Sequence, residues 1–320
     1  MNDRKKILEL VQQGKLTPEQ ADTLLEALGK RKQEKGKATR PWEVRSIGDL
    51  KQLGTQLSNT VSQSLADVRK TVEGELKVLS NLGIGASLSA STEVDLPATV
   101  KDVWLETRNG QIQVRTWDEN FIRVQVRGQV RSNDLTTAEQ QLEDSLQATQ
   151  SENRYHLTIL HDAKAGVLGA NVEVSVPVNM ESIAVQTANG EIRVDGVTAG
   201  QIRAESSNGS IWVSNSHGES LNLVTENGGI DMHESVYDTT ENVYASTRNG
   251  TIVIEGVAAD TNLSGVLKTA IGGIHVTRSN IRVEYIDPAR KMHARLFTDG
   301  AQGTPVHVHC ETRNGSIYVR

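Results

Sequence analysis

The side chains best suited to binding chemistry occupy one position of a repeated motif. Arg193, Trp212 and Asp231 each stand three residues after a glycine, in consecutive copies of that motif. An indole ring can stack on the face of a pyranose while charged groups bond its hydroxyls. The trio therefore predicts a ligand-binding face for carbohydrate, centred on Trp212. The alternative is an ordinary surface, because isolated exposed aromatic side chains need no function.

A second candidate site contains histidines near the carboxyl end. His307 and His309 share one face of an expected strand, and His275 or His293 could supply a third ligand for zinc. No carboxylate or thiolate spacing completes the set, because Cys310 alternates toward the inside of that strand. We therefore favour a solvated strand and expect neither a metal ion nor a cofactor.

Catalytic motifs are missing from the sequence. It contains no G-x-S-x-G, no H-E-x-x-H and no phosphate-binding loop. Parallel β-helix lyases gather several Asp with Lys or Arg on one face, whereas the position of Trp212 offers only Asp231. We expect a protein that is not an enzyme. The alternative from another class is a carbohydrate-binding or carbohydrate-active β-helix that uses the outer face around Trp212.

The candidate residues lie in a motif that recurs seven times and reads Thr/Ser-x-Asn-Gly-x-Ile-x-apolar. Only the sixth copy lacks the asparagine, which Ile271 replaces. The asparagines are Asn109, Asn189, Asn208, Asn227, Asn249 and Asn314. The glycines are Gly110, Gly190, Gly209, Gly228, Gly250, Gly272 and Gly315. The isoleucines are Ile112, Ile192, Ile211, Ile230, Ile252, Ile274 and Ile317.

Apolar residues alternate on both sides of each Asn-Gly step, and this period of 2 predicts strands. Asn-Gly is expected to form the turn, because both residues accept positive φ at low cost. Two architectures fit. In one, Asn-Gly closes hairpins of an antiparallel meander. In the other, each repeat is one coil of a parallel β-solenoid (a β-helix) of about 19–22 residues, in which identical residues stack in columns. The constancy of the columns favours the solenoid.

The spacing between copies is uneven. Most glycines of the motif follow one another after 19 or 22 residues, but 80 separate Gly110 from Gly190 and 43 separate Gly272 from Gly315. Since both long intervals are near multiples of the short one, we expect them to contain degenerate copies. A short helical insertion is expected near residues 135–144.

Charge divides the chain. Residues 1–81 contain 15 Lys and Arg against 11 Asp and Glu, and the remainder contains 19 against 29. An acidic repeat region is a poor nucleic-acid binder, because phosphate contacts need a basic face. Cys310 is the only cysteine, so no internal disulfide can form. Aromatic residues make up 3% of the chain, which suits a core of Ile, Val, Leu and Ala.

The amino-terminal third has helical patterns. Residues 1–30 read as a helical hairpin module, 31–46 as a basic linker, and 47–82 as a long amphipathic helix, ahead of a repeat domain over 98–320. A module this small needs a docking surface. We expect residues 1–82 to bind a protein partner or to self-associate. Contact with a membrane surface, aided by the basic linker, or with envelope glycan is the alternative.

No segment has the pattern of a secretory signal, and none approaches 18 consecutive apolar residues. The expected compartment is therefore the cytoplasm. Peripheral association with the membrane or the cell surface is the alternative.

The serial T-x-N-G-x-I-x-V units, the inserted Ala-x-x-x-Leu helix and the alternating valines closed by Val-Pro resemble the bacterial putative-adhesin family of β-strand repeats, over about residues 98–320. The opening "ILELVQQGKLTPEQADTLLEAL" is similar to the short helical module that precedes such repeats in envelope-stress proteins of Gram-positive bacteria. The resemblance implies a β-solenoid scaffold with a role in cell-envelope stress or surface interaction. It carries no catalytic residues over to this chain.

Overall fold

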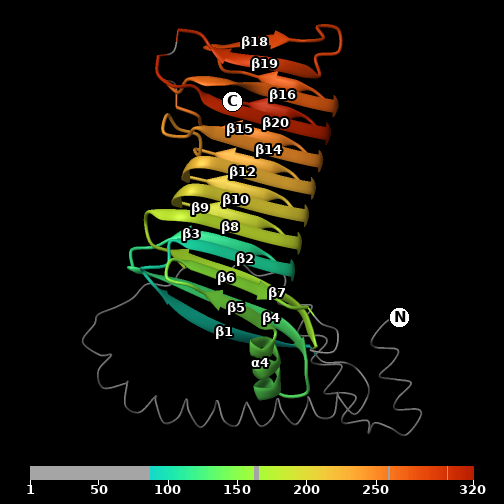
Figure 1. The fold of residues 1–320 in the computed structure, drawn as a ribbon. Helices are drawn as coiled ribbons and strands as arrows, with labels where there is room; N and C mark the ends of the chain where they lie inside the picture. The colour runs from blue at the N-terminus through green and yellow to red at the C-terminus, as the bar shows by residue number, and fades with distance from the viewer. Residues whose placement is uncertain (1–86, 162–165, 259, 301) are drawn as a thin grey trace, which may run out of the picture. The chain divides into compact units, whose positions relative to one another are not determined.

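The structure, a computed structural model, describes residues 87–161, 166–258, 260–300 and 302–320. These residues form two sheets over a shared apolar core (Figure 1). Sheet A has the strand order β1 (Ser87–Pro97), β4 (Phe121–Arg131), β7 (Val167–Val176), β3 (Ile112–Thr116), β9 (Ile192–Asp195), β11 (Ile211–Ser214), β13 (Ile230–His233), β15 (Ile252–Glu255), β21 (Ile317–Val319) and β17 (Ile274–Val276). Sheet B has the order β18 (Ile281–Tyr285), β19 (His293–Thr298), β16 (Leu263–Ile271), β20 (Val306–Asn314), β14 (Asn242–Asn249), β12 (His217–Asn227), β10 (Thr198–Asn208), β8 (Met180–Asn189), β2 (Asp102–Asn109), β6 (Arg154–Ile159) and β5 (Leu146–Gln150).

Each repeat contributes one strand to each sheet. The chain passes from β8 in sheet B to β9 in sheet A, returns to sheet B as β10, and continues in this way through β15. Neighbouring repeat strands are parallel in both sheets, as in the pairs β8–β10 and β9–β11. The fold is therefore mainly β, with two largely parallel sheets wound in a solenoid-like manner. The antiparallel meander is excluded.

The repeated isoleucines form a single column inside the molecule. Across sheet A the register aligns them in the order Ile112, Ile192, Ile211, Ile230, Ile252, Ile317 and Ile274. All seven are buried. Burial of a branched aliphatic side chain stabilises the fold by about 1.5–3 kcal/mol. Since each isoleucine also packs on the next one, the column links all copies of the repeat, as the sequence predicts.

The asparagines form a second column, on the surface. From Asn189 onward, each Nδ2 donates to Oδ1 of the preceding asparagine of the column, for example Asn208 to Asn189 at 2.9 Å and Asn227 to Asn208 at 2.9 Å, whereas Nδ2 of Asn109 donates to the Leu168 carbonyl. None of the six has a positive φ. The expectation that asparagine serves a left-handed turn is therefore wrong. It is the last residue of an extended strand, and its amide bridges one coil to the next.

The position after each asparagine of the motif is glycine because the backbones of neighbouring coils approach closely at this point. A Cβ atom at Gly209 would overlap the backbone oxygen of Gly190, and one at Gly228 would overlap that of Gly209. Of the seven glycines of the motif, only Gly110 and Gly272 have a positive φ. Close backbone stacking, more than turn conformation, thus selects glycine at this position.

The buried hydroxyl of the motif has a matching partner. Oγ1 of Thr225 donates to the carbonyl oxygen of Gly209 at 2.8 Å, and Oγ1 of Thr247 donates to that of Gly228 at 2.9 Å. Both threonines are less than 5% exposed. A buried hydroxyl without a partner destabilises a fold, so the threonine and the glycine of adjacent coils depend on each other.

The two long intervals contain one degenerate coil, formed by β6 and β7 with Val172 in register with Ile112, and not the several copies expected from the period. Between Gly110 and Gly190 lie one parallel strand pair, in which β6 joins β2 and β7 joins β3, and the antiparallel strands β4 and β5. Helix α4 (Leu135–Asp144) follows β4, capped by Asp134, which accepts from the Thr137 N–H at 2.8 Å. Between Gly272 and Gly315 lie β18 and β19, which are antiparallel to each other. Antiparallel strands thus terminate the parallel region at both ends, and a purely parallel solenoid was the wrong expectation there.

The expected helical module, basic linker and long amphipathic helix at residues 1–82 lie outside the described residues, so their roles stay predictions. Within the part of the chain that is described, no helix has the length and apolar character needed to cross a bilayer.

Candidate ligand-binding faces

The structure brings the three predicted ligand-binding residues together on sheet A. Trp212 on β11 is in register with Arg193 on β9 and with Asp231 on β13. The indole is 45% exposed. Arg193 is ion-paired with Glu191, and burial raises the pKa of Asp231. The tryptophan therefore has an open face, but the guanidinium beside it is already neutralised.

The predicted histidine group is divided between the sheets. His307 and His309 lie on β20 in sheet B, whereas His275 lies on β17 in sheet A and stacks on Tyr318 at a centroid distance of 4.8 Å. His293 is two strands from β20, on β19. No group of three His, Cys, Asp or Glu side chains within the described residues could hold a metal ion.

Sheet B has an outer row that the sequence reasoning missed. The residue six places before each motif glycine points outward, and the register joins these residues across the sheet. From β2 toward β16 the row contains Trp104, Ala184, Arg203, Asn222, Tyr244, His309 and Val266. Counting outward positions on both sides of the glycine, rather than only after it, would have found this row.

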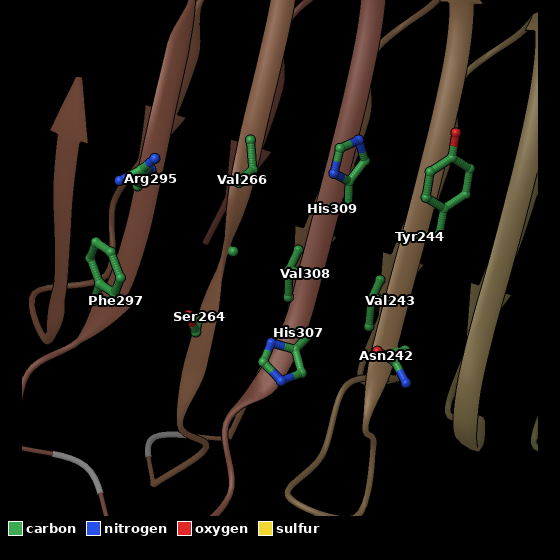
Figure 2. A pocket seen from close by; sticks show the side chains of 11 residues that line it. Asn242, Val243, Tyr244, Ser264, Val266, Arg295, Phe297, His307, Val308 and His309 are labelled. Atoms are coloured by element: carbon green, nitrogen blue, oxygen red, sulfur yellow. The ribbon is translucent and has the colours of Figure 1, made fainter. Parts of the chain in front are cut away.

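A groove of about 550 Å³ lies on this face near the carboxyl end (Figure 2). Four strands form it: β14 with Tyr244, β20 with His309, β16 with Val266 and β19 with Arg295. Tyr244 is 41% exposed, and its ring stacks on that of His309 with 5.4 Å between centroids and 11° between planes. Phe297, on β19, forms the opposite side of the groove.

A smaller groove of about 390 Å³ lies over Ala184, between Trp104 and Arg203. Trp104 stacks on His156 with a centroid distance of 4.6 Å. The charged residues that line this groove are already paired, because Arg203 contacts Glu205 at 2.5 Å and Arg154 contacts Asp102 at 2.7 Å. This groove therefore offers an aromatic face without an unpaired charge.

Residues 80–295 match the family described as Toastrack DUF4097. The chain belongs to the Toastrack DUF4097 family. Residues 2–33 match a second description, the SHOCT-like domain. Both matches agree with the resemblances seen in the sequence, a repeat domain of the adhesin-like type preceded by a short module.

Several solved structures similar to this toastrack chain are named as putative adhesins or cell adhesion proteins. A putative cell adhesion protein from Clostridium sporogenes is 10% identical, covers 73% of this chain and 99% of its own, and has a TM-score of 0.42. A putative adhesin from Bacteroides fragilis is 11% identical over 74% of this chain and 99% of its own, with a TM-score of 0.38. No curated protein matches the chain in sequence.

The toastrack repeat explains why both outer faces are ordered. Inward positions are committed to the core, and the asparagine and isoleucine columns fix each strand relative to the next. Outward side chains are therefore held at the strand spacing of about 4.8 Å. Such rows can bind an extended ligand at several points.

Proposed function

We propose that this toastrack chain is a non-enzymatic, adhesin-like scaffold that binds an envelope component through the outer faces of its sheets. One observation carries the proposal: three aromatic side chains that are 41–45% exposed are in register with polar side chains, Trp104 with His156 and Tyr244 with Asn222 on sheet B, and Trp212 with Arg193 on sheet A. Exposed aromatics on rigid strands make good contact surfaces, since little side-chain entropy is lost on binding.

Residues 1–82 have a separate part in the proposal. We assign them to self-association or to contact with a membrane surface, on the strength of their helical pattern and the match of residues 2–33 to the SHOCT-like domain. A chain that lacks residues 1–81 should then change in oligomeric state or lose association with anionic liposomes. An unchanged oligomeric state together with unchanged liposome binding would contradict this role.

The scaffold itself is tested with the full chain. Purified envelope fragments from a Gram-positive bacterium are mixed with the wild type and with the triple variant Trp104→Ser, Trp212→Ser, Tyr244→Ser. Sedimentation of the wild type and loss of sedimentation by the variant are expected, with circular dichroism to verify the fold. A matched triple variant at exposed positions away from these aromatic side chains, Asp238→Ser and Ser279→Ala in turns and Glu226→Ser on β12, should behave as the wild type. Equal sedimentation of all three proteins would refute the proposal.

The second candidate is carbohydrate binding centred on Trp212. The register of Trp212 with Arg193 and Asp231 favours it, because it places an aromatic face between two polar groups. Trp212→Ala should then abolish retention on a polysaccharide array. Trp104→Ala is a suitable control, since that indole is similarly exposed, at 42%, on the other sheet. A wild type that retains no glycan would remove this candidate.

A further inference from the structure

The groove near the carboxyl end has the form of a slot between two taller rows of side chains. Strand β16 presents the small outward residues Ser264 and Val266. On one side, β20 presents His307 and His309, and on the other β19 presents larger side chains (Figure 2). The rows on β20 and β19 are two strand spacings apart, roughly 9.6 Å.

Both walls of the slot carry a ring. His309 stacks on Tyr244 through one face, so its other face is turned toward β16. Phe297 is covered on its far side by the guanidinium of Arg282, 5.7 Å from the ring centroid, which leaves the face toward Ser264 open. The two rings are offset along the strands, because Phe297 is in register with Ser264 and His307, whereas His309 is in register with Val266 and Arg295. A pyranose that lies along the slot can contact both rings, one near each end.

Several polar groups of the slot are unused. Among the described residues, the side chains of Arg295, His307 and Ser264 form no hydrogen bond or ion pair with one another or with other groups. Unpaired donors that converge on one groove are suited to a hydroxylated ligand.

The slot is also cationic, although the chain as a whole has a net charge of −6. None of its lining residues is acidic, and Arg295 is one of them. Glu284, which is in register with Arg295 on β18, is ion-paired with Arg282 at 3.5 Å instead. Glu311, in the next row on β20, is bound by Lys268 at 2.9 Å, which lowers the pKa of Glu311, and lies 3.8 Å from His309. The charge of Arg295 is therefore available to an anionic group, and a planar carboxylate matches a guanidinium in geometry.

We propose that the slot between β20 and β19 binds a carboxylated pyranose, a hexuronate unit of an acidic polysaccharide. Arg295 binds the carboxylate, the rings of Phe297 and His309 face the sugar, and Ser264 and His307 bond its hydroxyls. This assignment rests on the proposed scaffold function and specifies a ligand for one of its faces.

The test uses the full chain and two matched probes, trigalacturonate and its methyl ester, measured by isothermal titration calorimetry. The acid should bind more tightly than the neutral ester. Arg295→Gln should weaken acid binding about ten- to hundredfold, the usual effect of losing a charged hydrogen bond, and should leave ester binding unchanged. Phe297→Ala should weaken both probes by about three- to tenfold, and Phe297→Tyr should restore them. Arg248→Gln, on the outer face of β14 but outside the groove, should change neither.

Three results would overturn the assignment: no binding of either probe, equal binding of acid and ester, or the same loss with Arg248→Gln as with Arg295→Gln. The sedimentation experiment separates this failure from failure of the scaffold. Envelope binding that survives Arg295→Gln in a protein that binds no uronate leaves the scaffold standing and removes the slot.

Discussion

Ile252 is paired with Ile317 in the last strand of the chain, and not with Ile274, the next isoleucine of the repeat along the sequence. The final strands β20 and β21 lie between β14 and β16 in sheet B and between β15 and β17 in sheet A. The last segment of the chain is therefore an interior coil of the stack, and both of its neighbours depend on it.

Deletion of residues 303–320 tests this dependence. The truncated chain loses the strands that join β14 to β16 and β15 to β17, so β16–β19 should become accessible to protease while β8–β13 stay protected. Hydrogen exchange with peptide mapping would measure both regions. Addition of the peptide 303–320 in trans is expected to restore protection. Protected β16–β19 in the truncated chain without the peptide would contradict the assignment.

A core isoleucine and an outward neighbour give a matched pair for stability. Ile230 is fully buried, and Ile230→Ala should lower the free energy of unfolding by about 2–5 kcal/mol. Val253 points outward on the adjacent strand, and Val253→Ala should cost under about 1 kcal/mol. Urea denaturation of both variants gives the comparison. Similar losses for the two would show that the isoleucine column does not dominate the core.

The sequence contains enough information for the columns, because every copy of the motif has an inward isoleucine and a buried threonine or serine. It also places Trp212 beside Arg193 correctly, since equal positions of adjacent repeats must be in register. The order in which the coils stack does not follow from the motif. The copies around Ile252, Ile274 and Ile317 have the same pattern, so the motif does not distinguish which of them are neighbours in the stack.

The repeat pattern also did not predict the slot on sheet B. Its floor and one wall come from β16 and β19, and β19 contains no motif, so Arg295 and Phe297 carry no periodic signal. The role of asparagine was misjudged for a different reason. Asn-Gly is common in tight turns, but the same dipeptide also occurs where an extended asparagine bridges neighbouring coils through its side chain. The dipeptide alone therefore does not distinguish the two structures.

His161 should make stability depend on pH. Its Nε2 accepts from the Asn109 N–H at 3.3 Å and lies 2.9 Å from Thr107 Oγ1. Burial, with the charge of Arg108, lowers the pKa of His161 below its usual 6.5. The unfolded chain then binds a proton more readily than the folded chain, so stability is full above the unfolded pKa and falls as the pH drops through that value toward the lower folded one.

The measurement is the urea midpoint between pH 7.5 and pH 5 for the wild type and for His161→Gln. Glutamine can still accept a hydrogen bond but does not titrate, so the variant should lose less stability on acidification. Other groups titrate equally in both proteins, which makes the difference specific to His161. Identical pH profiles would exclude this contribution.

Cys310 should be inert while the protein is folded. It is fully buried, and burial raises the pKa of its thiol to about 12. At pH 8 the thiolate, which is the reactive form, is then almost absent. An aromatic disulfide reagent should react at pH 8 only after unfolding in guanidinium, and the rate reports global opening. The matched control is Cys310→Ala with Arg248→Cys, whose exposed thiol should react at once. Rapid labelling of native Cys310 would contradict the burial.

The asparagine column should protect the chain chemically. Asn-Gly deamidates when the glycine nitrogen attacks the side-chain Cγ, forming a succinimide and releasing ammonia, and water then opens the ring to aspartate or isoaspartate. The glycine N–H is held in the fold, as in the bond from Gly190 N to Asn208 O at 3.0 Å, and the amide is held by its ladder bonds. Native protein should therefore deamidate far more slowly than protein unfolded in urea, as followed by peptide mapping.

Asn314 should be the first of the six to react in the native state. Its Nδ2 donates to Asn249 at 2.7 Å, but Ile271 occupies the next position, so no described residue donates to Asn314 Oδ1. Asn227 has ladder bonds on both sides and should react more slowly. Ile271→Asn supplies the missing donor and should slow Asn314 to the rate of Asn227. If Asn314 is no faster than Asn227, or if Ile271→Asn leaves its rate unchanged, the side-chain ladder is not what suppresses the reaction, and the backbone bond of the glycine alone would account for it.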